Sequence, residues 1–272
     1  MRIGVHLPQY GRVAGADAIK RSARHAEELG FLDVWVSDHI VHPAAQDYPS
    51  PYLLDPLVTL TWAAAATERI GLGTSVLVVP THHPLELANS LASLDALSGG
   101  RLTIAVGVGW SEQEYVALGY DFHNRGKRLD EAIILFRLAW SEDPVSFHGE
   151  FNSFDDLRIL PNPSHRIPIW IGGSSEPAYR RAGALGDGFQ AVGLSTEEAG
   201  PVVERIRRDH PDLSFPISLR TGWDPQGMDP GRIRDELAAF SEAGIQHVVA
   251  APWQRDPDEW IRSMDRLAEL VL

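Results

Sequence analysis

Eight short apolar segments alternate with eight helical segments from one end of this 272-residue chain to the other. The predicted strands cover residues 2–8, 33–37, 70–79, 102–108, 167–171, 188–192, 215–221 and 246–250. A strand followed by a helix and another parallel strand forms a right-handed crossover. Eight such units predict a parallel sheet, most simply closed into one (β/α)8 TIM barrel over residues 1–272. A doubly wound open sheet is the alternative architecture.

Helical periodicity and helix-start signals predict the segments between these strands. The predicted helices cover residues 16–30, 55–69, 84–98, 129–140, 176–185, 196–208, 233–240 and 260–271. Long segments follow strands two, four and seven, at residues 40–54, 109–126 and 222–229, and a hairpin at 145–159 precedes strand five. Barrel enzymes build their sites at the carboxyl ends of the strands. We therefore expect the three long segments to surround a site, and the hairpin to be structural or interfacial.

Composition excludes several classes of protein. No cysteine is present, so there are no disulfides and no thiolate sites, which fits a reducing cytoplasm. The net charge of −13 disfavours nucleic acid and anionic membranes as partners. The N-terminus shows no signal-peptide pattern, and no apolar run is long enough to span a membrane. We expect a cytoplasmic protein with a small-molecule substrate.

A glycine loop after predicted strand five is a candidate phosphate cradle. Gly172, Gly173, Ser174 and Ser175 follow the strand, and Pro177 suits the first turn of the next helix. Glycines let a ligand approach the backbone closely, and the free N–H groups at a helix start attract anions.

Polar residues end predicted strand two in the order Ser37, Asp38, His39. At that end of a barrel strand, an Asp–His pair suits acid–base chemistry or hydrogen bonds to a ring cofactor. The alternative is an Asp that caps the loop and a structural His.

Strands three and four end in small residues. Ser75 and Val76 are read from the pattern alone as buried packing residues. Gly107, Val108, Gly109 and Trp110 contain a GxG too short for a dinucleotide fingerprint, so they indicate either close approach of a ligand or tight packing. Neither the His-x-His and HExxH patterns of metallohydrolases nor a GxSxG elbow occurs, so we expect no metal site and no serine hydrolase.

Taken together, these stretches resemble the bacterial luciferase-like superfamily, and within it the coenzyme F420-dependent oxidoreductases of actinobacteria. The resemblance covers about the first 190 residues and rests on residues 2–4, 37–39, 73–77, 94–102, 107–110, 125–131, 168–174 and 186–188. FMN-dependent relatives share the barrel and much of this pattern.

The resemblance implies a cofactor ring at the carboxyl end of the barrel. It places Asp38 and His39 beside the ring, and it implies a cis peptide bond between Ser75 and Val76 that bulges under the deazaflavin. It assigns residues 107–110 and 172–175 to the cofactor's tail and phosphate. One departure is Trp110, which stands where the sugar-phosphate dehydrogenase branch has a catalytic glutamate.

These implications predict an F420-dependent oxidoreductase that transfers hydride to or from a small organic substrate, with His39 as the catalytic residue. The alternatives are an FMN-dependent monooxygenase and a cofactor-binding protein without turnover. Relatives commonly pair through barrel helices, and the helices here carry surplus apolar residues such as Trp62, Leu91 and Ala92, so we expect a homodimer.

Overall fold

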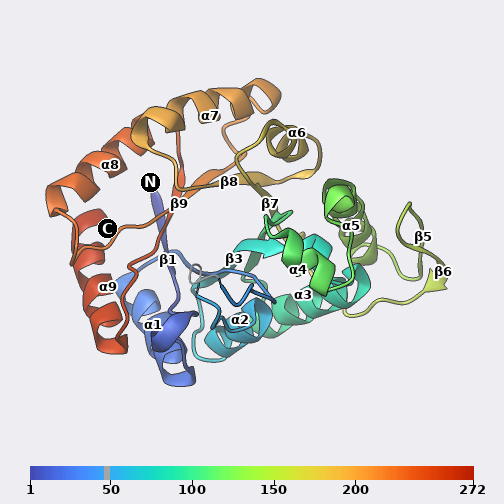
Figure 1. The fold of residues 1–272 in the computed structure, drawn as a ribbon, viewed down its shortest axis with the longest axis horizontal. Coiled ribbons are helices and arrows are strands. Elements are labelled where there is room, and N and C mark those ends of the chain that lie inside the picture. The colour runs from blue at the N-terminus through green and yellow to red at the C-terminus, as the bar shows by residue number, and fades with distance from the viewer. Residues whose placement is uncertain (46–49) are drawn as a thin grey trace.

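The computed structural model describes residues 1–45 and 50–272, and in these ranges eight parallel strands close into a barrel (Figure 1). Around the barrel the order is β1 (Arg2–His6), β10 (His247–Ala250), β9 (Ile217–Thr221), β8 (Gly188–Val192), β7 (Ile169–Gly172), β4 (Leu102–Gly107), β3 (Gly71–Val78) and β2 (Asp33–Val36). Pairing of β1 with both β2 and β10 closes the ring. The predicted TIM barrel is confirmed, and the open sheet was wrong.

Helices surround the strands on the outside (Figure 1). They are α1 (Ala16–Leu29), α2 (Pro56–Ala64), α3 (Pro84–Ser98), α5 (Arg125–Ala139), α6 (Glu176–Leu185), α7 (Thr196–Asp209), α8 (Pro230–Glu242) and α9 (Pro257–Val271). Their start and stop signals act as the sequence suggests: the Asp55 side chain accepts the N–H of Val58, and Gly30 ends α1 in the left-handed conformation. None of the described helices is both long and apolar enough to cross a membrane.

Helix α2 ends five residues before the predicted limit of 69. The backbone after α2 leaves the helical path, and two charged side chains form hydrogen bonds with it there. The Arg101 guanidinium donates to the carbonyls of Ala64 and Thr67, while the Glu27 carboxylate accepts the N–H groups of residues 68–70. These tertiary bonds replace the last helical turn that local sequence alone favours.

The two predicted excursions are present. After β4 lie the short helix α4 (Glu112–Ala117) and the single turn η3 (Phe122–Asn124). Before β7, the antiparallel strands β5 (Val145–His148) and β6 (Ser153–Leu157) form the predicted hairpin, which projects to one side of the barrel in Figure 1. The predicted long segment at 40–54 includes residues 46–49, which lie outside the described residues.

Two of the three residues named for a dimer interface are core residues. Leu91 and Ala92 are buried in the apolar layer between α3 and the barrel. Trp62 is 42% exposed, but its Nε1 donates to the Ala16 carbonyl and the Lys20 ammonium lies 4.0 Å from its ring centre. The residues chosen from the sequence therefore do not mark a dimer surface, and the homodimer stays a prediction.

A buried polar chain crosses the amino-terminal half of the barrel interior. Gln190 on β8 donates to Ser218 on β9, whose Oγ lies 2.7 Å from His247 Nδ1 on β10. His247 Nε2 in turn donates to Asp33 Oδ1 on β2 at 3.0 Å. Trp35 also donates to this carboxylate. The chain satisfies polar groups inside the core, as buried polar groups require.

Candidate functional site

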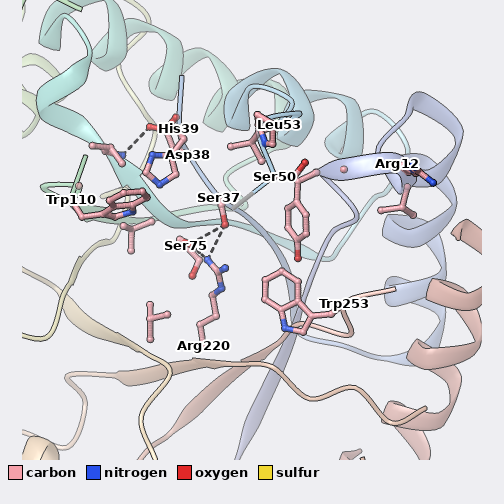
Figure 2. A pocket seen from close by; sticks show the side chains of 18 of the residues that line it. Arg12, Ser37, Asp38, His39, Ser50, Leu53, Ser75, Trp110, Arg220 and Trp253 are labelled. Atoms are coloured by element: carbon pink, nitrogen blue, oxygen red, sulfur yellow. Dashed lines mark hydrogen bonds between the residues drawn. The ribbon is translucent and has the colours of Figure 1, made fainter. Parts of the chain in front are cut away.

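A cavity of about 1030 Å³ opens among the loops at the carboxyl ends of the strands. Its volume lies at the upper end of the usual range for small-molecule and cofactor sites. Figure 2 shows most of the side chains that line it. The lining comprises Tyr10, Gly11, Arg12, Val13, Ser37, Asp38, His39, Ser50, Pro51, Leu53, Ser75, Val76, Val78, Gly109, Trp110, Val192, Arg220, Trp253, Gln254 and Arg255.

Ser75 and Val76 on β3 form part of the cavity wall. The peptide bond between them is cis, as the family resemblance implies, and the pairing of β3 with β4 shifts register between Thr74 and Leu77. Gly107 and Gly172 make room for the Val76 side chain. A Cβ at Gly107 would lie 2.8 Å from Val76 Cγ2, and one at Gly172 would lie 2.4 Å from Cγ1. The two glycines therefore accommodate the two methyl groups of Val76.

His39 is held by a buried glutamate from the insertion after β4. Its Nδ1 lies 2.9 Å from Glu114 Oε2, while Glu114 Oε1 accepts the backbone N–H groups of Ile40 and Val41. Burial of Glu114 raises its pKa, but the hydrogen bonds from His39 and the two N–H groups outweigh burial, so the pKa of Glu114 lies below its usual value. An ionised Glu114 accepts a hydrogen bond from the Nδ1–H of His39, which leaves Nε2 of His39 for a ligand.

Aromatic rings pack around His39. The Trp110 ring meets it edge to face at a centroid distance of 5.4 Å, and His42 packs on it at 5.4 Å. Burial and the neighbouring His39 lower the pKa of His42. Trp110 is 56% exposed and lines the cavity, so its ring is available to an aromatic ligand.

Asp38 has partners of its own and does not orient His39. Its Oδ2 accepts the backbone N–H of Val78 at 2.9 Å and His82 Nε2 at 2.8 Å. Burial disfavours the charged form of His82, but the hydrogen bond and charge of Asp38 outweigh it and raise the pKa of His82. Asp38 thus fastens the β3–α3 connection beside the cavity. Its other oxygen, Oδ1, is buried without a hydrogen-bond partner in the described part of the chain.

Arg220 at the end of β9 holds the wall from below in Figure 2. Its Nη1 donates to Ser37 Oγ at 2.8 Å and to the Ser75 carbonyl. Ser37 Oγ lies 3.0 Å from His6 Nε2, and His6 Nδ1 donates to the Leu7 carbonyl. Complete burial and the Arg220 charge lower the pKa of His6 to about 3, so His6 is neutral and its Nε2 accepts from Ser37.

The predicted cofactor residues divide into two groups. One group lines the cavity: Asp38, His39, Ser75, Val76, Gly109 and Trp110. The other, Gly107, Val108 and Gly172 to Ser175, is not among the described residues that line it. Ser175 occupies the N-cap of α6 without a side-chain capping bond. Gly173 has a φ of 142°, which favours glycine. The anion cradle at this loop stays a prediction.

No cluster of three His, Cys, Asp or Glu side chains within residues 1–45 and 50–272 is arranged to hold a metal ion.

The sequence profile of the luciferase-like monooxygenase family matches residues 1–226. This chain belongs to that family. An F420-dependent glucose-6-phosphate dehydrogenase of Beutenbergia cavernae is 34% identical over 266 residues, covering 88% of this chain and 78% of the relative. The resemblance proposed from the sequence is thus confirmed.

Solved structures of similar fold use two kinds of cofactor. An F420-dependent secondary alcohol dehydrogenase in complex with an F420–acetone adduct superposes with a TM-score of 0.84 at 20% identity, covering 99% of this chain and 98% of the other. The oxygenating constituent of 3,6-diketocamphane monooxygenase from Pseudomonas putida, in complex with FMN, gives 0.78 at 17%, covering 100% and 97%. At these identities the likeness shows the shared luciferase-like fold.

Sequence reasoning left much of the cavity lining unnamed, including Tyr10, Arg12, Arg220, Trp253 and Arg255. It also gave no role to Glu114 or His6, which lie behind the lining. Arg220 and Trp253 could have been found, because both lie at or just beyond the carboxyl ends of predicted strands seven and eight, where barrel sites form. Glu114 lies close in sequence to the position at which the sugar-phosphate dehydrogenase branch has its catalytic glutamate, but its partner could not be predicted, because its contact with His39 joins residues 75 positions apart.

Proposed function

We propose that this protein is an oxidoreductase that uses coenzyme F420 and transfers a hydride between the deazaflavin and a small organic substrate. The observation that carries the proposal is one cavity that combines the Ser75–Val76 wall with a histidine whose Nδ1 is fixed by a buried carboxylate. The name of the 34% identical relative and the F420-dependent structural neighbour support the choice of cofactor.

The residues present suit a flat cofactor with polar edges. Val76 offers an apolar surface, and Trp110 offers an exposed ring in the same cavity. Ser75 Oγ and Asp38 Oδ1 are buried atoms with no hydrogen-bond partner among the described residues. Buried polar atoms of this kind are costly unless a ligand or water satisfies them. A heterocycle with carbonyl and N–H groups along its edge would do so.

The side chains have separate tasks in this proposal. The bound deazaflavin supplies the hydride chemistry. His39 takes up or gives a proton at Nε2 as the substrate's oxygen changes charge. Glu114 is a positioning residue, because it fixes the His39 ring through Nδ1. Arg220 holds the Ser75 carbonyl and so fixes the wall against which the ring would lie.

Binding of the two cofactors to the purified apoprotein tests the proposal. We expect F420 to bind at least about tenfold more tightly than FMN, which corresponds to about 1.4 kcal/mol. FMN that copurifies with the protein or binds more tightly than F420 would replace this proposal by a flavin monooxygenase. F420 binding without turnover on alcohols, aldehydes and sugar phosphates would indicate a binding protein.

The variant His39→Ala tests the role of the histidine. We expect turnover to fall by about 10²–10⁴ while the affinity for F420 changes little. His148→Ala is the matched control, because His148 is exposed on the β5–β6 hairpin. Normal turnover with weakened F420 binding would move His39 from proton transfer to cofactor binding.

A further inference from the structure

The charge of the cavity is opposite to that of the molecule. The chain carries 37 acidic and 24 basic side chains, yet the described residues that line the cavity include three arginines and one carboxylate. That carboxylate, Asp38, is already bonded to His82. A cationic cavity in an anionic protein concentrates anions locally against the overall field.

Two of the arginines, Arg12 and Arg255, have no hydrogen bond or ion pair in the structure of residues 1–45 and 50–272, and both are exposed. The third is Arg220, which is engaged with Ser37 and the Ser75 carbonyl. The acidic residues close to the pair in sequence have other partners. Asp17 and Asp258 pair with Arg21, and the Asp256 carboxylate caps α9. Arg12 and Arg255 therefore remain for a ligand.

The two arginines follow neighbouring strands of the barrel. Arg12 lies in the turn η1 (Gly11–Val13) after β1, where the Gly11 N–H donates to the Tyr52 carbonyl and Tyr10 bridges to Leu53. Arg255 follows β10, the neighbour of β1 in the barrel. The loop before it is held by Gln254, which donates to Asp224. Both arginines thus line the cavity from the side of β1 and β10.

An aromatic pair lies between this side and the cavity wall. The rings of Tyr10 and Trp253 are 5.1 Å apart, and Trp253 stacks on His6. In Figure 2, Arg12 lies beyond Trp253, at the opposite end of the view from His39 and Trp110. A ligand that spans the cavity would meet aromatic surface in the middle and positive charge at one end.

We propose that Arg12 and Arg255 form a subsite for a carboxylate or phosphate group of the substrate. The substrate is then an organic anion whose apolar or ring-shaped body lies on Tyr10 and Trp253, with its reacting carbon toward Val76 and His39. Guanidinium groups suit this task because their forked donors match the geometry of carboxylates and phosphates. That the bound anion is part of the substrate rests on the proposed function. That Arg12 and Arg255 bind an anion does not depend on it.

Matched probes test the subsite on apoprotein by calorimetric titration. We expect benzoate and phenyl phosphate to bind at least about tenfold more tightly than phenol, and this preference to decline as salt is added. The double variant Arg12→Gln/Arg255→Gln should lose the preference. The control Arg234→Gln/Arg266→Gln removes the same charge from the exposed surfaces of α8 and α9 and should keep it. Equal binding of phenol and the two anions by the wild type would overturn the proposal.

The source of the anion is settled by a second titration with F420, whose own tail is anionic. We expect the double variant to bind F420 with unchanged affinity, because the residues matched to the tail lie on β4 and β7, away from β1 and β10. A parallel loss of F420 affinity would assign the arginines to the cofactor and refute a substrate subsite. If F420 fails to bind the wild type but the anion preference persists, the proposed function is wrong and the anion site stands.

Discussion

Replacing Gly172 by alanine would test how the cavity wall is built. A Cβ at this position would lie 2.4 Å from Val76 Cγ1 and 3.4 Å from the Val106 carbonyl oxygen. Carbon atoms normally approach to about 3.5–4.0 Å, so the overlap exceeds one ångström. The φ of Gly172 lies outside the left-handed region, and the cost is therefore steric. We expect Gly172→Ala to lower the free energy of unfolding by about 1–3 kcal/mol.

Removing the obstructing methyl groups should relieve that cost. In the double variant Gly172→Ala/Val76→Ala the nearest atom of residue 76 would be its Cβ, at 3.4 Å. Val76→Ala alone should cost about 1 kcal/mol, because Val76 is only partly buried. The double variant should cost little more than that. Urea denaturation of all four proteins then gives a coupling energy of about 1–3 kcal/mol.

Gly200→Ala provides the matched control. Apart from its chain neighbours, no atom lies within 4 Å of a Cβ at Gly200 inside helix α7. The helix propensity of alanine favours the substitution and Pro201, which follows, opposes it, so the free energy of unfolding should change by less than about 1 kcal/mol. Additive effects of the Gly172 and Val76 substitutions, within about 0.5 kcal/mol, would refute this account of the glycine. Gly172 would then have to be explained by direct contact with a ligand.

Two further predictions concern buried ionisable groups. Glu114→Gln should lower the free energy of unfolding by about 2–3 kcal/mol at pH 7, whereas Glu112→Gln, exposed on the same helix, should change it by less than about 0.5. The pKa of Glu114 is lowered in the folded state, so its contribution to the free energy of unfolding is complete above the ordinary pKa of 4.5 and is lost as pH falls through the folded pKa. The difference in free energy of unfolding between wild type and Glu114→Gln, measured by urea denaturation, should therefore disappear in acid. A gap that widens below pH 4.5 would contradict the ionised state assigned to Glu114. His6 has a pKa of about 3 in the folded state and 6.5 when unfolded, so between pH 3 and pH 6.5 it is protonated only in the unfolded chain. Lowering the pH below 6.5 should therefore destabilise the fold, and His6 alone should lower the free energy of unfolding by about 2 kcal/mol between pH 7 and pH 5. His6→Gln should remove that part of the pH dependence, and an unchanged slope would show that His6 is not neutral in the fold.

The barrel could be predicted from the sequence because its signals are local. Apolar strands, capped helices and the glycine that ends α1 each leave a pattern within a few residues, and the crossover rule converts the order of these elements into a topology. The location rule for barrel sites placed His39 at the carboxyl end of the barrel, and the family resemblance added Val76 and Trp110 to the predicted cofactor site. All three line the cavity.

What the sequence could not supply is the identity of contact partners. Asp38 and His39 are adjacent in sequence, yet one pairs with His82 and the other with Glu114. A glycine in the sequence indicates that a side chain would not fit at that position, but it does not say which neighbouring atoms occupy the space. Gly107 and Gly172 leave the room that the methyl groups of Val76 occupy, and their predicted contact with a cofactor stays a prediction. Such pairings depend on loop conformation and tertiary packing, which leave no short-range signal.

The buried chain of Ser218, His247 and Asp33 has the residue types of a hydrolase triad without the means to act as one. All three side chains are closed into the core at the end of the barrel opposite the cavity, and they fasten β9, β10 and β2 together without help from any loop. The two ends of the barrel therefore have different roles: one binds ligands and the other stabilises the fold. Changes in the loops at the cavity end can alter the substrate site. They do not disturb the buried side chains at the opposite end, which keep the strands together.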